Sequence, residues 1–488
     1  MSLSARTEAR RVEALASLDP EKQSKLGQFF TPARAAELIA SMVRLPKSGS
    51  LRVLDPGAGV GSLTAALVER VAREAPDVRL DIIAVELDPL VVPYLRETLV
   101  DCTGPRVRTH LVQGDFITES SGALDGIGEL HEPFDLVVMN PPYGKLGATS
   151  AYRRALQAAG VECPNLYAAF LALGYLNLVD GGQVVAIIPR SFANGTYFRD
   201  FRKHLLSETA LDRIHTFESR STVFADTGVL QENVIISAIR GGSIESVHVT
   251  SSVGHEDEVV ERVVPTVEVV RPGDPHRFVR ITLDDEALPD AAGCVLADLG
   301  LTASTGRVVD FRAREWLVDA EVDGSVPLVY PGNVRLGRIE WPRAIRKPQG
   351  FLVGEEAADR LLFPPGSYVV IKRFSSKEER RRVVAAVWES TTPVAFENHL
   401  NVIHCNGRGL DPLLAVGLCI WLNSTGIDRF FRTFSGHTQV NATDLRTLPT
   451  PSEVDLRRLG AMWPKGATEQ AEIDHLVDAV IGSAVRAA

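Results

Sequence analysis

Short apolar runs that alternate with helical patterns constrain the fold of this chain more than any other feature of its sequence. They predict strands at residues 51–54, 81–85, 107–112, 134–139, 183–188, 213–217 and 233–239. Helical patterns separate several of these runs, most clearly at 62–74, where Ser62 is the expected N-cap, and at 165–179. Strands joined through helices form parallel βαβ units with right-handed crossovers. We therefore expect an α/β fold with a parallel sheet in the first half of the chain.

A glycine loop follows the first expected strand, with Gly57, Gly59 and Gly61 at alternate positions behind Asp55. Glycines let the backbone approach a ligand closely and leave amides exposed at a helix N-terminus. The spacing differs from the GxGxxG loop of dinucleotide folds, and Asp55 would repel a pyrophosphate. The loop therefore favours a cationic ligand, such as one that carries a free amino group or a sulfonium.

Acidic residues also stand at the ends of the next two expected strands. Glu86 ends the second strand, where its carboxylate could accept hydrogen bonds from both hydroxyls of a ribose. Asp115 and Phe116 follow the third strand, where the acid could accept an adenine amino group and the ring could flank the base. Each acid by itself could equally be a helix cap or a turn residue. Taken together, successive strand ends favour an adenosyl ligand at the carboxyl edge of the sheet.

The fourth expected strand ends in the tetrapeptide Asn140-Pro141-Pro142-Tyr143. The Asn140 side-chain oxygen and the Pro141 carbonyl can both accept hydrogen bonds from one NH2 group, which directs the nitrogen lone pair toward an electrophile. Pro142 stiffens the turn by fixing φ, and Tyr143 offers a face on which a planar base can stack. Asn-Pro-Pro after a strand is also an ordinary turn. The tetrapeptide therefore suits methylation of a planar amine, and the rest of the chain must support that interpretation.

The order of these motifs resembles one family of enzymes. The motifs are Gly27-Gln28-Phe29-Phe30-Thr31-Pro32, Asp55-Pro56-Gly57-Ala58-Gly59, Glu86, Asp115-Phe116 and Asn140-Pro141-Pro142-Tyr143. In this order the chain resembles the gamma-class DNA adenine-N6 methyltransferases of restriction–modification type, which include the TaqI, PstI and BsuBI enzymes. The resemblance implies a Rossmann-like, S-adenosylmethionine-dependent methyltransferase sheet. It also implies a C-terminal target-recognition domain of mixed α/β structure.

The resemblance further implies a role for individual residues. The implied cofactor site holds Phe30, Thr31, Asp55, Gly57 and Gly59 toward the methionine end, Glu86 at the ribose, Asp115 and Phe116 at the adenine, and Asn140 beside them. The implied catalytic residues are Asn140, Pro141, Pro142 and Tyr143, with Phe224 as a second aromatic wall for a base flipped out of the duplex. Val223-Phe224 also has a structural interpretation, because a Val-Phe pair is more often part of a core.

The activity implied by the resemblance is transfer of a methyl group from S-adenosylmethionine to N6 of adenine in a recognition sequence of double-stranded DNA. Such an enzyme would serve the modification arm of a restriction–modification or phage-defence system, with a separate cognate restriction endonuclease as a partner. Few residues precede Gly27 or follow Thr450, so we expect a modification enzyme alone. Methylation of an RNA base or of a protein glutamine remains an alternative, because the same tetrapeptide suits those amines. A non-catalytic specificity subunit is a third.

Net charge at first sight argues against a nucleic-acid partner, since 52 Lys and Arg face 62 Asp and Glu, a balance of −10. Residues 271–449, however, contain 22 residues of each sign, so the acidic excess lies elsewhere. A basic cluster lies within that segment, at Lys372, Arg373, Lys377, Arg380, Arg381 and Arg382. Although such runs are more often solvated faces, we expect Lys372 and Arg373 to contact the DNA backbone.

Three regions are expected along the chain. Residues 1–245 would form the catalytic domain, 246–292 a linker or connecting segment with an embedded strand, and 293–488 the DNA-recognition domain with a closing helix. Within the last region we expect an amphipathic helix at 410–431. The five scattered cysteines lack a CxxC pair and indicate reduced thiols. With no signal sequence or membrane span in view, the sequence predicts a cytoplasmic protein, and no metal motif is present. The resemblance implies that the protein is prokaryotic and nucleoid-associated.

Overall fold

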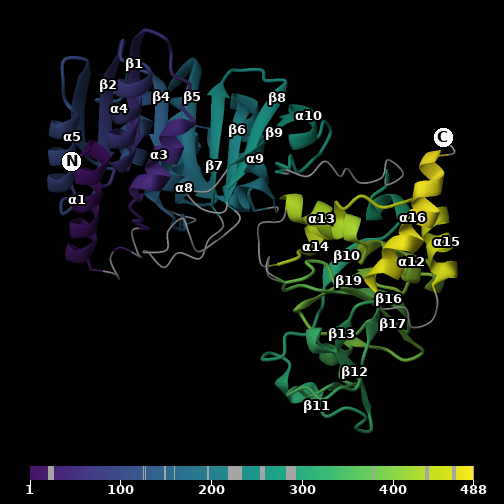
Figure 1. Cartoon of the computed structure of the whole chain (residues 1–488). Coiled ribbons are helices and arrows are strands. Elements are labelled where there is room, and N and C mark those ends of the chain that lie inside the picture. Colours follow the sequence, from purple (N-terminus) through teal and green to yellow (C-terminus); the bar gives the residue numbers. More distant parts are fainter. Residues whose placement is uncertain are drawn as a thin grey trace. The chain divides into compact units, whose positions relative to one another are not determined.

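A computed structural model of the chain describes residues 1–486 apart from 20–22, 24–26, 125, 127, 148–149, 159, 195–196, 218–232, 253–258, 282–292, 376–378, 435–438 and 464–468. The chain divides into two compact units, Met1–Leu283 and Asp284–Ala488 (Figure 1). We describe each unit by itself.

Unit 1 is built on a nine-stranded sheet of order β3-β2-β1-β4-β5-β7-β6-β8-β9. Its strands are β1 (Gly49–Pro56), β2 (Val78–Glu86), β3 (Val107–Gln113), β4 (Phe134–Met139), β5 (Leu178–Pro189), β6 (Thr209–Phe217), β7 (Asn233–Arg240), β8 (Ser246–Ser252) and β9 (Val260–Pro265). The block from β3 to β5 is parallel, and β7 runs antiparallel between β5 and β6. The expected α/β class and parallel block are confirmed.

Helices cover both faces of this sheet. One face carries α1 (Leu3–Ser17), α3 (Ala33–Ser41), α4 (Ser62–Glu74) and α5 (Val92–Cys102); the other carries α6 (Phe116–Leu124), α7 (Ala151–Ala158), α8 (Leu166–Leu176) and α9 (Arg199–Glu208). The two faces follow from the period of a strand. In β4, Leu136 and Val138 belong to the core beneath α3 and α4, whereas Val137 and Met139 belong to the core beneath α6 and α8. The sheet therefore lies between two helical layers.

Helices α8 and α4 begin in different ways, one with a side-chain cap and the other after a glycine. The α8 helix begins as expected behind Asn165, whose side-chain oxygen accepts a hydrogen bond from the Ala168 amide. The expected N-cap of α4 is wrong, because Ser62 is already the first helical residue and Gly61 precedes it at φ +87° without a side-chain cap. A left-handed backbone favours glycine at this position. The third glycine of the loop thus directs the chain into α4.

Residues 246–252 and 260–265 correct the expectation of a linker from 246 to 292. Strand β8 pairs in parallel with β6, and β9 pairs antiparallel with β8. Val247, Val249 and Val264 are buried in the same core as the central strands. The segment alternates buried and partly exposed residues, which is the pattern of a strand with one covered face. It therefore extends the nine-stranded sheet, and unit 1 reaches Leu283.

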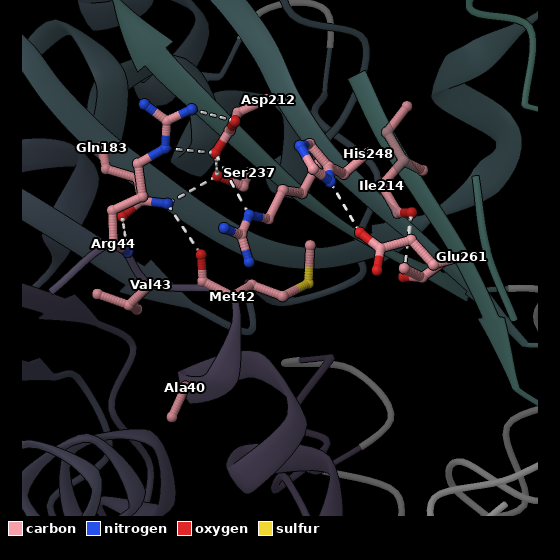
Figure 2. A network of polar contacts seen from close by, with 12 residues as sticks. Ala40, Met42, Val43, Arg44, Gln183, Asp212, Ile214, Ser237, His248 and Glu261 are labelled. Atoms are coloured by element: carbon pink, nitrogen blue, oxygen red, sulfur yellow. Dashed lines mark hydrogen bonds and ion pairs between the residues drawn. The ribbon is translucent and has the colours of Figure 1, made fainter. Parts of the chain in front are cut away.

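A polar network joins the end of α3 to the sheet (Figure 2). The Gln183 side chain accepts a hydrogen bond from the Arg44 amide at 2.8 Å and donates to the Met42 carbonyl at 3.0 Å and the Ser237 hydroxyl at 2.7 Å. Arg44 Nε donates to buried Asp212 at 2.9 Å, and the Ser237 hydroxyl donates to the same carboxylate. Because α3 begins directly after Pro32, this network also holds the end of the Gly27–Pro32 motif in place.

Unit 2 is a mixed α/β domain, as expected. Its strands are β10 (Thr302–Thr305), β11 (Leu317–Val318), β12 (Ser325–Val329), β13 (Val334–Arg335), β14 (Arg338–Ile339), β15 (Gly350–Leu352), β16 (Gly366–Lys372), β17 (Ala385–Ser390), β18 (Ala395–Phe396) and β19 (Leu400–His404). They form sheets of order β10-β19-β16-β17 and β11-β15-β12-β18 and the hairpin β13-β14. Its helices are α11 (Glu356–Asp359), α12 (Pro412–Leu422), α13 (Thr425–Phe434), α14 (Ala442–Arg446), α15 (Glu453–Met462) and α16 (Gln470–Arg486).

The single amphipathic helix expected at 410–431 is instead two helices, α12 and α13, separated at Asn423 and Ser424. Helix α12 is buried around almost its whole circumference. Asn423 explains the break, because its side chain accepts a hydrogen bond from the Ala385 amide at 3.0 Å and donates to the Ala385 carbonyl at 2.8 Å. These bonds imitate the pairing of a strand residue. Asn423 therefore ties the end of α12 to β17.

Three further properties of the described residues concern membrane spans, metal ligands and cysteines. No helix there is both long and apolar enough to cross a bilayer. The described residues also include no cluster of His, Cys, Asp and Glu suited to a metal ion. All five cysteines are free thiols.

Candidate active site

The carboxyl ends of β1, β2, β3 and β4 open into a cavity of about 290 Å³. The residues expected at the site that line it are Phe30, Gly57, Gly59, Glu86, Asp115, Phe116, Asn140 and Pro142. A smaller hollow of about 20 Å³ shares Phe30, Gly57, Gly59 and Asn140 with this cavity and adds Thr31 and Asp55. The structure thus brings the five motifs to one place. Four of them follow parallel strands that end at one edge of the sheet, and the Gly27–Pro32 motif joins them there.

The glycine loop is shaped by contacts that a side chain would prevent. Gly57 and Gly59 have φ values of +68° and +57°, and a Cβ on Gly59 would lie 2.8 Å from Cδ1 of Phe30. The Gly59 amide donates to Glu86 at 2.9 Å, and the Asp88 amide donates to the other Glu86 oxygen at 2.8 Å. Burial raises the pKa of Glu86. The glycine loop is therefore joined to Glu86 by a hydrogen bond from its backbone to the carboxylate.

Asp55 is the most deeply buried acid of the site, with 1% of its surface exposed. One carboxylate oxygen accepts a hydrogen bond from the Thr64 hydroxyl at 2.7 Å, while the other has no partner among the described residues. Burial, with a smaller contribution from the nearby Glu86, raises the pKa of Asp55 to about 7. A buried carboxylate with a vacant oxygen favours a cation as its missing partner.

Asn140 contacts the Gly27–Pro32 motif directly. Its side-chain nitrogen donates to the Phe29 carbonyl at 2.8 Å and to the Thr31 hydroxyl at 3.0 Å. A carbonyl oxygen can only accept hydrogen bonds, so the NH2 group of Asn140 must face Phe29. The opposite atom, Oδ1, is therefore the one left to accept hydrogen bonds from a ligand.

Tyr143 lies against the same motif. A Cβ on Gly27 would come within 2.7 Å of the Tyr143 backbone nitrogen, and Gly27 has φ +64°, so glycine is required here. The Tyr143 ring lies 5.8 Å from the Phe29 ring between centroids. Its hydroxyl is buried and has no partner among the described residues, and burial raises its pKa. The Gly27–Pro32 motif thus positions both ends of the tetrapeptide.

Asp115 has the helix-cap role that the sequence left open as an alternative, and its second oxygen has a partner of its own. One oxygen accepts hydrogen bonds from the Ile117 and Thr118 amides at the start of α6, as a helix cap does. The other accepts a hydrogen bond from the Tyr152 hydroxyl, which raises the pKa of Tyr152 to about 12. The sequence analysis missed Tyr152, which lines the main cavity from α7. A polar aromatic in an amphipathic turn after the tetrapeptide was the available signal, and it is a weak one.

Phe116 is flanked by a second residue that the sequence analysis did not select. The Phe170 ring lies 4.9 Å from the Phe116 ring between centroids and also lines the cavity. Phe170 belongs to α8, which is apolar and buried along almost its whole length, so periodicity could not distinguish it. Phe224, the expected second wall for a target base, lies outside the described residues.

The expected DNA-contacting residues lie in unit 2, on and after β16. Lys372 is the last residue of β16 and Arg373 follows it, and both side chains are partly exposed. The Arg373 guanidinium donates inward, to the Asn398 carbonyl at 3.2 Å and to Gln439 Oε1 at 3.3 Å. Arg382, from the same basic cluster, is only 1% exposed, and Arg381 donates to the Asn423 carbonyl. Lys377 lies outside the described residues. Much of this cluster's charge is therefore used within the unit.

Comparison with known proteins gives full-length relatives. The Eco57I restriction-modification methylase family model matches residues 108–224. The type II methyltransferase M.BsuBI of Bacillus subtilis is 40% identical over 94% of this chain and 95% of its own length. M.PstI of Providencia stuartii, also a type II methyltransferase, is 38% identical over 98% of this chain and 97% of its own length.

A solved structure extends the likeness of fold. The type IIL restriction-modification enzyme MmeI in complex with DNA has a TM-score of 0.54 at 11% identity, covering 88% of this chain and 70% of that one. At that identity the likeness concerns the fold alone.

Proposed function

This chain belongs to the type II methyltransferases of restriction–modification systems, and from that premise we propose that it methylates the N6 amino group of adenine at a specific sequence in double-stranded DNA. As a member of this family it is a DNA methyltransferase that uses S-adenosylmethionine. The choice of adenine, and the residues that perform the reaction, are the parts of this proposal that require an experiment.

The orientation of Asn140 is the observation that carries the proposal. Because its NH2 group donates to the Phe29 carbonyl and the Thr31 hydroxyl, Oδ1 is the atom that can accept a hydrogen bond from a ligand. The carbonyl of Pro141, the next residue, is a second acceptor. Two acceptors suit an exocyclic amine that presents two N–H groups, and they leave its nitrogen lone pair free to attack.

The cofactor supplies an electrophilic methyl group bonded to a positively charged sulfur. The vacant oxygen of Asp55 suits the cationic end of that molecule, and Glu86 and Asp115 suit its ribose and its adenine. Phe116 and Phe170 form an apolar wall of the same cavity. These residues bind and orient the cofactor, and they shield the reacting groups from water.

In the transfer itself, the target nitrogen forms a bond to the methyl carbon while the carbon–sulfur bond breaks and leaves its electron pair on sulfur. The amine then releases one proton to solvent. No strongly basic side chain is required, because the nitrogen becomes acidic once it carries the methyl group. Asn140 and Pro141 act by holding the amine in an orientation in which its lone pair is available.

A paired adenine can reach these acceptors only after it leaves the duplex, at a cost of about a few kcal/mol. Stacking on aromatic rings, worth about 1–3 kcal/mol per base, offsets much of that cost. We assign one wall to Tyr143, and by resemblance the other to Phe224. Unit 1 then performs catalysis and unit 2 target recognition. A separate restriction endonuclease cutting the same sequence would complete the system.

The decisive experiment offers S-adenosylmethionine with a tritiated methyl group to unmethylated genomic DNA and, in parallel, to ribosomal RNA. We expect label in DNA, and after digestion to nucleosides we expect it in N6-methyl-2′-deoxyadenosine. Label in methylcytosine would contradict the choice of base. Label in RNA and not in DNA would contradict the choice of substrate.

A further inference from the structure

Unit 2 contains a loop, residues 331–347, that carries a concentrated positive charge on an otherwise acidic chain. We name it the arginine loop. It contains five basic residues and one acidic residue, a net charge of +4, whereas the whole chain has −10. The hairpin β13-β14 forms its first half, with Val334 opposite Ile339 and Arg335 opposite Arg338.

Two buried amides fix the base of the arginine loop. The Asn333 side chain donates to the Glu340 carbonyl at 2.9 Å and to Gln349 Oε1 at 2.7 Å. Gln349 also accepts from the Arg343 amide at 3.1 Å and donates to the Arg343 carbonyl at 2.6 Å. Both amides are buried. A loop backbone fixed in this way loses little further conformational entropy when its side chains bind a partner.

Three arginines share a single carboxylate on this base. Glu340 lies 2.9 Å from Arg338, 3.2 Å from Arg343 and 3.6 Å from Arg335. One negative charge cannot neutralise three positive charges, so the group keeps an excess of two. Arg338 is the most open of the three, with 57% of its side chain exposed.

The second half of the arginine loop adds further basic residues. Arg346 is exposed and forms no ion pair or hydrogen bond with any described residue. Lys347 is half-exposed and pairs with Asp310 at 2.5 Å. The loop thus offers one cation without a partner and a cluster with incomplete compensation, whereas Arg373 and Arg381 of the expected cluster donate to internal carbonyls.

We propose that the arginine loop is a surface through which unit 2 contacts the phosphate backbone of duplex DNA. The proposal rests on the proposed function, because duplex DNA is the polyanion that this family must hold. Arginine presents several N–H donors in a plane and suits phosphate oxygens. A strongly acidic chain repels DNA as a whole, so its binding surface must concentrate positive charge locally, as this loop does.

The proposal is tested by the salt dependence of DNA binding in the full chain. Arg338→Ala and Arg346→Ala remove exposed guanidiniums without disturbing Asn333 or Gln349. Each lost phosphate contact lowers the slope of log K against log salt by about 0.9 and weakens binding about five-fold near 0.15 M salt. The double variant is expected to lose about two slope units on duplexes of any sequence. Cofactor affinity should not change.

Arg458→Ala is the matched control, since this arginine is also exposed, lies in α15 of unit 2 and has a single weak ion pair at 3.6 Å. We expect it to keep the wild-type slope. Thermal melting of all variants checks that they remain folded. If Arg338→Ala, Arg346→Ala and the double variant keep the wild-type slope, the arginine loop is a solvated face and the proposal is wrong.

Failure of this proposal differs from failure of the proposed function. If the wild type methylates DNA while the slopes of all variants are equal, only the arginine loop is excluded. If the wild type neither binds nor methylates duplex DNA, the proposed function fails first. A slope loss with Arg458→Ala of the same size as with Arg338→Ala would also overturn the assignment, since the effect would then be general.

Discussion

The strand-end site of unit 1 and the asparagine at the end of α12 in unit 2 use the same side chain for opposite purposes. Asn140 donates from its NH2 group to the Phe29 carbonyl, and its oxygen forms no hydrogen bond with any described residue. Asn423 places its oxygen and its NH2 group on the backbone of Ala385, so both are used within the fold. An asparagine that keeps part of its hydrogen-bonding capacity unused is available for chemistry, whereas one whose donor and acceptor are both satisfied within the fold serves packing.

The largest expected effect comes from Asn140→Ala. Loss of an oriented acceptor in the transition state should lower the rate of methyl transfer about 10²–10³-fold. Cofactor affinity should stay within a few-fold, because the cavity keeps its other walls. Single-turnover transfer and equilibrium binding, measured on the same preparation, separate the two. Near-wild-type transfer would remove Asn140 from the catalytic role.

Asn423→Ala is the reciprocal substitution. It leaves the buried amide of Ala385 without a partner, whereas the Ala385 carbonyl keeps its hydrogen bond from the Gly337 amide at 3.0 Å. The loss should cost about 1–3 kcal/mol of unfolding free energy. Denaturant unfolding followed by circular dichroism measures this loss. Cofactor affinity at low temperature is expected to remain that of the wild type. A loss of cofactor binding in the folded variant would show that the two regions are not separable in this way.

From the raised pKa of Asp55 we predict that both the stability of unit 1 and its affinity for the cofactor depend on pH. Burial raises the pKa of Asp55 from 3.8 to about 7, so the folded chain without cofactor holds a proton that the unfolded chain has lost between these values. Its contribution to stability therefore falls as pH rises through that window. A cationic ligand beside Asp55 favours the ionised form, and cofactor affinity should fall as pH drops below 7, by at most about tenfold per pH unit.

Isothermal titration between pH 5.5 and 8 measures this dependence through both affinity and proton release. Asp55→Asn keeps the shape of the side chain and cannot ionise, so it should bind weakly with a flatter profile. An unchanged pH profile in Asp55→Asn would assign the titration to another group, and Glu86, whose pKa burial also raises, would be the next to test.

The smallest expected effect concerns Tyr152, whose hydroxyl occupies one oxygen of Asp115 when the cavity holds no ligand. If the cofactor's adenine amine uses that oxygen, Tyr152→Phe removes a competitor. Affinity should then rise about two- to five-fold, the equivalent of about 0.5–1 kcal/mol for one hydrogen bond. Fluorescence titration with cofactor measures it. Weaker binding would instead indicate that the hydroxyl contacts the cofactor itself.

Much of unit 1 could be predicted because its signals are periodic. Strand β4 follows the apolar run 134–139 residue for residue, and the alternation of strands and helices requires that strand ends share one edge. The antiparallel insertion of β7 and the two added strands β8 and β9 could not be predicted in the same way. Their neighbours are far apart in the chain, and a strand's own pattern does not identify its partner.

Unit 2 was less predictable for the same reason. The run of basic residues at 372–382 is conspicuous in the sequence, yet burial of Arg382 and the inward bonds of Arg373 direct much of its charge into the fold. The arginine loop has a comparable density of charge, but its exposure depends on Asn333 and Gln349 meeting across the loop. Charge can be counted in a sequence, whereas exposure cannot.

The sequence by itself determined the α/β sheet, the edge at which its motifs meet and the chemical groups present there. Strand period and strand order suffice for these properties, since both are local or nearly so. The tertiary structure determined which atoms of those groups remain available. Asn140 meets Phe29 and Thr31 across 111 and 109 residues of chain, and Tyr152 meets Asp115 through the packing of α7. Contacts between distant residues leave no periodic trace, because they depend on how completed elements pack.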